Sequence, residues 1–229
     1  MLRRARLYST CFIMKSSLEK EKPAASARPR GRPTVDRRGE ILDAAEELFG
    51  TIGFEKTTVS DIAKRLGMTQ PNVYRTFKNR RELDEAVVER HLDGVSDMAW
   101  MIAKRDRAED MPERLFREFN LAIMRNTVAM VVDNFKMFEI CKVASRDRWP
   151  IVDAFVADLG AAVAHILDRG VADGSFAIED TAATAETIVE AMLKVFHPHL
   201  VEIFRDDDLE ASTRRLTELI LAGIRRVNI

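Results

Sequence analysis

The chain has 229 residues, of which 46% are hydrophobic and 32% charged, and its formal net charge is −1. No apolar run approaches the about 18 residues that a membrane span needs. Cys11 and Cys141 lie far apart, without the spacing of a disulfide framework or a zinc site. We therefore expect a soluble, cytoplasmic protein with reduced thiols and a substantial core.

The net charge conceals an asymmetry between the two parts of the chain. Residues 1–90 hold 19 Lys and Arg against 13 Asp and Glu, whereas the remaining residues hold 17 against 24. A basic front end is a candidate for nucleic-acid binding. A solvated face with a basic tail remains the alternative unless a binding motif is present.

Residues 1–35 show no sustained periodicity and are rich in Pro, Ala, Arg and Gly, which predicts a disordered basic arm. The first 13 residues resemble an organelle transit peptide, and translation from Met14 is the alternative. The segment "RPRGRP" resembles the core of an AT-hook, in which arginines enter the minor groove. A sequence-neutral phosphate contact or a free tail is the other reading of Arg28, Arg30 and Arg32.

Beyond Asp36 the apolar pattern is helical. A first helix is predicted from spacings of three and four residues and ends near Gly50 and Gly53; its apolar positions are Ile41, Leu42, Ala45, Leu48 and Phe49. In "TTVSDIAKRLG", Thr58 and Asp61 have capping-box spacing, and Gly67 ends the helix. Thr69 is an N-cap for a second short helix. Two short helices joined by a tight turn are typical of a helix-turn-helix.

The remaining sequence predicts further helices over about 80–104, 112–130, 133–146, 150–173, 179–204 and 207–227, with a kink at Pro198. No alternating strand pattern is found. The fold class is therefore all-α, with a helix-turn-helix domain at 36–90 and a helical regulatory and dimerisation domain at 91–229.

The second short helix carries the residues expected to read DNA. On a helical wheel Val73 and Phe77 lie about 40° apart and point inward, which leaves the opposite face exposed. In a helix-turn-helix this helix enters the major groove. Arg75, Gln70 and Asn72 suit base edges, and Pro71 suits a thymine methyl group. The other predicted DNA ligands, suited to phosphate contacts or flanking the helix, are Thr58, Thr69, Tyr74, Lys78 and Arg80.

The run from Gly39 to Leu83 resembles the N-terminal domain of the TetR family of bacterial transcriptional regulators. The matching features include Gly53-Phe54, Thr57-Thr58-Val59, Asp61-Ile62-Ala63, Val73-Tyr74 and Phe77. Pro71-Asn72 departs from the family pattern, so the operator preference of a relative does not transfer. The resemblance implies a cytoplasmic, nucleoid-associated homodimer that pairs through its last two helices, binds a pseudo-palindromic operator and carries an inducer site in its C-terminal domain.

A small apolar or amphipathic ligand is expected between the C-terminal helices, and core packing is the alternative role of the same side chains. The candidate ligand-binding residues are Trp100, Phe119, Met124, Met137, Phe138 and Trp149. The helix over about 80–104 is the expected mechanical link to the DNA-binding domain. We expect no cofactor and no metal, since His197 and His199 are two residues apart and have no clustered ligands nearby.

The sequence thus predicts a DNA-binding regulator, in its main interpretation a repressor released by a small ligand. A TetR-like protein that responds to a protein partner or organises DNA is the first alternative. A helical enzyme using Cys141 or the histidines is the second, although no catalytic motif is found.

Overall fold

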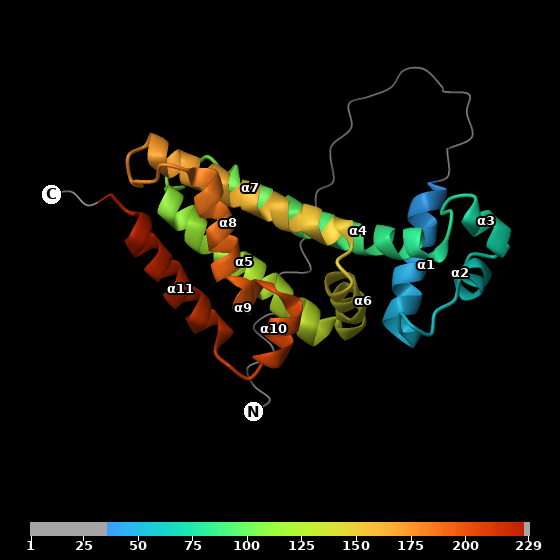
Figure 1. Ribbon diagram of the computed structural model, residues 1–229. Helices are drawn as coiled ribbons and strands as arrows, with labels where there is room; N and C mark the ends of the chain where they lie inside the picture. Colours follow the sequence, from blue (N-terminus) through green and yellow to red (C-terminus); the bar gives the residue numbers. More distant parts are fainter. Residues whose placement is uncertain (1–35, 227–229) are drawn as a thin grey trace, which may run out of the picture. The chain divides into compact units, whose positions relative to one another are not determined.

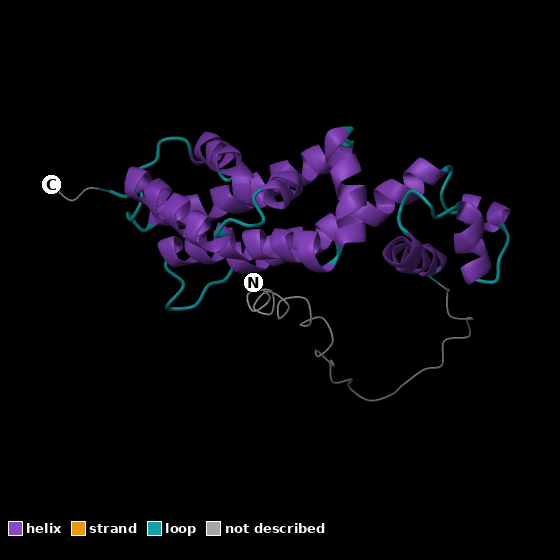
Figure 2. Ribbon diagram, turned by 90° about the horizontal axis from the view of Figure 1, so that it is seen from below, coloured by secondary structure: helices purple, strands orange, loops and turns teal. Residues whose placement is uncertain are grey.

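The computed structural model describes residues 36–226. The predicted arm at 1–35, with Arg28, Arg30 and Arg32, lies outside the described residues. Within the described part the chain forms helices and loops without a strand (Figure 2); a single isolated bridge pairs Phe176 with Arg225. The helices are α1 (Arg37–Ile52), α2 (Val59–Arg65), α3 (Gln70–Tyr74), α4 (Arg80–Ala103), α5 (Pro112–Asp133), α6 (Phe135–Arg146), α7 (Pro150–Ala172), α8 (Thr181–Ala191), α9 (Leu193–Phe196), α10 (Pro198–Ile203) and α11 (Leu209–Ile224). The all-α prediction is confirmed.

Two compact units divide the chain between Arg80 and Arg81, in the first turn of α4. The sequence-based boundary at residue 90 falls later in the same helix. Helix α4 is uninterrupted across this boundary. Its first residue, Arg80, is the last residue of the N-terminal unit, and the rest of the helix belongs to the C-terminal unit.

Local capping explains where the helices of the N-terminal unit begin and end. The Asp36 side chain accepts a hydrogen bond from the Gly39 backbone N at 3.0 Å and so caps α1. Gly53 ends α1 with a φ angle of +96°, a backbone conformation that residues with a Cβ atom rarely adopt. The predicted capping box of α2 is confirmed: Asp61 N donates to Thr58 Oγ1 at 3.2 Å, and Thr58 N donates to Asp61 Oδ2 at 3.0 Å.

Helix α5 is the central element of the C-terminal unit. It packs against α11, α10, α7, α6 and α9, and in Figure 1 α11 runs alongside it. Its buried side chains follow helical spacing on more than one face and include Leu115, Phe116, Phe119, Ile123 and Met124. A helix that is apolar around most of its circumference must be enclosed, and α5 therefore organises the core of this unit.

Ion pairs join α5 to α11 outside that core. Arg225 donates to both oxygens of Glu113, at 2.8 and 2.6 Å. Arg117 bridges the same carboxylate and Glu218. These guanidinium contacts, led by the hydrogen bond from Arg225, lower the pKa of Glu113. The pairs fix the register of α11 along α5 more than they add stability, because the groups are partly exposed.

Arg169 on α7 holds the C-terminal end of α4. Its guanidinium donates to the backbone oxygen of Ala103 at 3.2 Å and to that of Arg105 at 2.6 Å. A third contact reaches the backbone oxygen of Asp110 at 3.4 Å. The Ala103 carbonyl at the end of α4 lacks an intrahelical partner. The other two carbonyls lie in the loop that follows, so Arg169 ties this loop to the helix end.

The prediction of one continuous helix over 179–204 is wrong. The chain forms α8, α9 and α10 instead, with breaks at Met192 and His197. Pro198 has no backbone N–H and cannot continue the helix, and His197 adopts extended backbone angles before it. The expected kink is therefore a full interruption.

The sequence predicted no segment apolar enough to span a membrane, but α7 is such a segment by length and composition. Its most apolar window has a mean hydropathy of 1.6. Its many Ala, Val and Gly residues raise this mean although Asp153, Asp158 and Asp168 interrupt any apolar run. In the structure α7 packs against α8 and α5 as a bundle helix.

Candidate nucleic-acid interface

Helices α2 and α3 form a compact helix-turn-helix. Leu66 ends α2, Gly67 adopts φ of +63°, and the Met68 backbone N donates to the Ala63 oxygen at 2.9 Å to close the turn. Val73 and Phe77, the predicted inward anchors, are each only 1% exposed. The Arg38 guanidinium lies 5.3 Å from the centre of the Phe77 ring. Burial of the two anchors therefore fixes the orientation of α3.

The opposite face of α3 is open to solvent. Gln70, Pro71 and Arg75 are exposed, as are Tyr74 and the N-cap residue Thr69. Asn72 is half-buried, and Lys78 is exposed just after the helix. Thr69 occupies the N-cap position but its side chain makes no capping hydrogen bond. The structure thus brings seven of the predicted DNA-binding residues onto or beside one short helix.

Thr58 and Arg80 have structural contacts within the same unit. Thr58 Oγ1 donates to Asp61 Oδ2 at 2.6 Å as part of the α2 cap. The Arg80 guanidinium donates to the backbone oxygens of Thr57 and Phe54. It also lies over the ring of Phe49, with 5.4 Å between its central carbon and the ring centre. Arg80 therefore closes the loop between α1 and α2, a role that the local sequence pattern does not indicate.

The family described as "Bacterial regulatory proteins, tetR family" matches residues 41–87, and "Tetracyclin repressor-like, C-terminal domain" matches residues 112–217. The chain belongs to the TetR family of bacterial transcriptional regulators.

Individual TetR-family relatives support the same assignment. The transcriptional activator FasR of Mycolicibacterium smegmatis is 38% identical over 77 residues, which cover 33% of this chain and 35% of FasR. This chain thus matches about a third of the length of FasR. The regulator TtgR of Pseudomonas putida is 23% identical over 75% of this chain and 86% of its own length. The structure of SmeT, the repressor of a Stenotrophomonas maltophilia multidrug efflux pump, has a TM-score of 0.61 at 22% identity and covers 84% of this chain and 92% of SmeT.

The C-terminal unit of this TetR-family chain contains a largely apolar cavity of about 90 Å³. Its wall comes from seven helices and the residue before α10. Val88 and Leu92 belong to α4, Met130 to α5, and Cys141 and Ser145 to α6. The other wall residues are Val152, Phe155, Val156, Leu159, Val189, Leu193, Phe196, His197 and Pro198.

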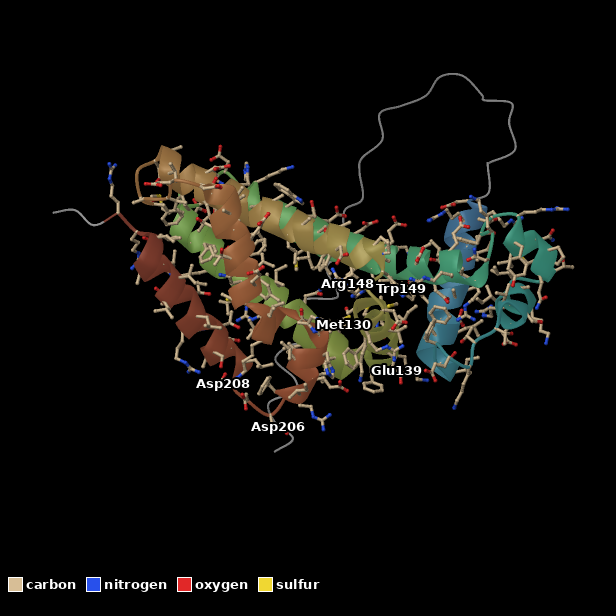
Figure 3. All side chains as sticks on the ribbon, in the orientation of Figure 1. Met130, Glu139, Arg148, Trp149, Asp206 and Asp208 are labelled. Carbon is tan, nitrogen blue, oxygen red and sulfur yellow. The ribbon has the colours of Figure 1, made fainter. Side chains whose placement is uncertain are left out.

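The six residues predicted to bind ligand do not contribute to this wall. Phe119, Met124, Met137 and Phe138 are buried in the core of the unit. Trp100 donates through Nε1 to Asp158 Oδ1 at 2.9 Å. Figure 3 labels Trp149 and Arg148 in the connection between α6 and α7, and Met130, a wall residue, on α5.

The cavity wall carries no charged side chain among the described residues. Burial raises the pKa of the Cys141 thiol to about 12, so this thiol stays protonated at neutral pH. Burial, with a smaller contribution from nearby His199, lowers the pKa of His197, so its imidazole is neutral as well. The cavity therefore favours an uncharged, mostly apolar occupant.

Proposed function

We propose that the chain is a sequence-specific DNA-binding repressor that leaves its operator when a small ligand occupies the C-terminal cavity. The observation that carries DNA binding is the helix-turn-helix in which Val73 and Phe77 are buried while Arg75, Tyr74 and Gln70 face solvent. Selection of binding sites from random double-stranded DNA tests it. Recovery of no enriched sequence would contradict the proposal.

Replacing Arg75 by alanine should weaken binding to the selected site by about 1 to 3 kcal/mol and relax the preference at one base pair. An exposed guanidinium on the outer face of α3 can donate two parallel hydrogen bonds to a guanine edge. Binding to the selected site and to single-base variants measures both effects.

Lys78→Ala is the matched comparison for this prediction. A phosphate contact carries no sequence information, so its loss should weaken all DNA sequences alike. If Arg75→Ala left both affinity and base preference unchanged, the assigned reading face of α3 would be wrong.

The predicted arm at 1–35 lies outside the described residues and is proposed to contact DNA through Arg28, Arg30 and Arg32. Deletion of residues 1–33 should weaken DNA binding and flatten the slope of log affinity against log salt by about 0.9 for each lost phosphate contact. Titrations at several salt concentrations measure this slope. An equal slope for the full chain and the deletion would make the arm a passive tail.

The cavity supports the ligand part of the proposal because α4 contributes to its wall. Val88 lies eight residues after Arg80, or about 12 Å along the helix axis, and Leu92 lies one turn further. An occupant that presses against these side chains therefore acts on α4. SmeT has also been solved in complex with triclosan, and RolR in complex with resorcinol. We infer that this chain is regulated in a comparable way.

A homodimer is proposed through the outer faces of α8 and α11. Larger apolar side chains of this region, including Ile188, Val189 and Met192, are already buried within the chain. Small side chains on the surface of α8, such as Ala183 and Thr187, remain exposed, and on α11 Leu219 is 71% exposed. An open groove of about 400 Å³ follows this surface, lined in part by Ala183, Thr184, Thr187 and Gly223. Small side chains allow a second pair of helices to approach closely, and a dimer would supply two recognition helices for a pseudo-palindrome.

Ala183→Arg should convert the dimer to a monomer, because it places a long charged side chain in the groove. Light scattering at micromolar concentration measures the mass, with a dimer expected for the unchanged chain. Met101→Arg is a control, since Met101 is 68% exposed on α4 and should leave the mass unchanged. A monomeric unchanged chain would contradict the proposed dimer.

The two alternatives have less support. A partner-regulated or DNA-organising protein would leave the cavity without a role. An enzyme would need an activated group, whereas the thiol of Cys141 has a raised pKa. Among residues 36–226, no group of three His, Cys, Asp or Glu side chains could hold a metal ion. The family consists of transcriptional regulators, and we propose that this chain acts on DNA in the cytoplasm without catalysis.

A further inference from the structure

We propose that the cavity takes an uncharged single-ring aromatic alcohol whose hydroxyl group hydrogen-bonds to Nδ1 of His197. This inference rests on the proposed function only in assigning the cavity to a ligand. It adds the chemical class of that ligand and the residue that selects it.

His197, one of the wall residues, has a buried ring nitrogen, Nδ1, without a hydrogen-bond partner among the described residues. His197 precedes α10, where Pro198 interrupts the helix, so the break between α9 and α10 places a histidine in a largely apolar wall whose other polar side chains are Ser145 and the Cys141 thiol. A buried polar atom without a partner is unfavourable, and a ligand that satisfies it gains affinity relative to one that does not.

The rest of the wall selects the body of the ligand. Phe155 and Phe196 offer aromatic surfaces, and the Met130 sulfur suits the edge of a ring. The remaining wall residues are mainly aliphatic, and the neutral state of Cys141 removes any attraction for a cation. An apolar ring is therefore favoured over a charged or highly polar molecule.

The size of the cavity limits the ligand to a small molecule. Its volume of about 90 Å³ is well below the roughly 300 Å³ at which sites for drug-sized ligands begin. Leu193 lines the wall and is partly exposed, so its side chain can move to admit a ligand. One ring with a single hydroxyl group fits these limits better than a fused-ring compound.

The test compares 4-methylphenol with 1,4-dimethylbenzene, which differ only by a hydroxyl group in place of a methyl group. Calorimetry on the full chain without DNA should give about 10-fold tighter binding of 4-methylphenol, a difference of ~1.4 kcal/mol. His197→Leu should abolish this preference while 1,4-dimethylbenzene still binds, which also shows that the variant is folded. His197→Asn, whose amide can replace Nδ1, should restore part of the preference.

His199→Leu is the matched control. His199 is exposed, contacts Glu202 at 3.3 Å between Nδ1 and Oε2, and is absent from the cavity wall. Its replacement should leave the preference for 4-methylphenol intact. Equal binding of both probes, binding of neither, or a preference that survives His197→Leu would overturn the inference. These measurements are made without DNA, so none of their outcomes tests the repressor function. A failure of ligand-controlled repression would appear in a separate experiment, as operator binding that is unchanged when 4-methylphenol is bound.

Discussion

Replacing Phe77 by alanine should destabilise the N-terminal unit by about 3 to 5 kcal/mol and abolish operator binding at physiological temperature. Phe77 is fully buried directly after α3, so its removal leaves a cavity under the recognition helix. A loss of this size is comparable to the whole stability of a small unit. Thermal unfolding and operator titration measure the two effects.

The C-terminal unit provides an internal control for this variant. It has its own core around α5, so its secondary structure and its binding of 4-methylphenol should persist when the N-terminal unit unfolds. Tyr74→Ala is the matched substitution, because Tyr74 is an exposed aromatic residue at the end of α3, three residues before Phe77. It should weaken DNA binding without lowering the melting temperature. If Phe77→Ala kept full stability, the burial that orients α3 would have no energetic role.

A ligand that weakens operator binding about 100-fold, or ~2.7 kcal/mol, must itself bind about 100-fold more weakly to the operator complex. The expected result is therefore two affinities for 4-methylphenol that differ by this factor, one without and one with saturating operator. Calorimetry in the two conditions measures the coupling directly. Equal affinities would exclude release by this molecule and leave DNA binding intact.

Val189→Phe tests whether the coupling passes through the cavity. Val189 lines the wall from α8, and a larger side chain there fills space that the ligand needs. Ligand binding should be lost and operator binding retained, at a cost of about 1 to 3 kcal/mol in stability from overpacking. Retained ligand binding would place the site elsewhere.

The helix-turn-helix could be predicted from the sequence because its determinants are local. The cap formed by Thr58 and Asp61 spans one turn, and Val73 and Phe77 are set by helical spacing alone. The break at Met192 could not be predicted, since no Pro or Gly marks it and the apolar pattern continues across it. The disturbance of the helix at Pro198 could be predicted, because proline lacks the backbone N–H that a helix needs as a hydrogen-bond donor.

The cavity could not be predicted from the sequence because its wall comes from residues 88 to 198. Trp100 and Trp149 are large apolar residues and therefore natural candidates, yet packing places them away from the wall. The contacts of Arg80 could not be predicted for the same reason, because they join residues that are distant in sequence. Its guanidinium donates to the backbone oxygens of Phe54 and Thr57, more than 20 residues earlier. Only the folded chain brings such groups together.

The contacts of Arg169 give α4 two unequal ends. The carbonyls of Ala103 and Arg105 are held by a guanidinium, so this end resists fraying. Strain introduced at Val88 and Leu92 cannot then be relieved by melting the last turn of α4. Displacement of α4 is therefore favoured toward the end that begins at Arg80. If the cavity binds a ligand as proposed, Arg169 keeps the displacement of α4 from being lost as local unfolding at Ala103, and replacing Arg169 should weaken the reciprocal coupling between ligand and operator.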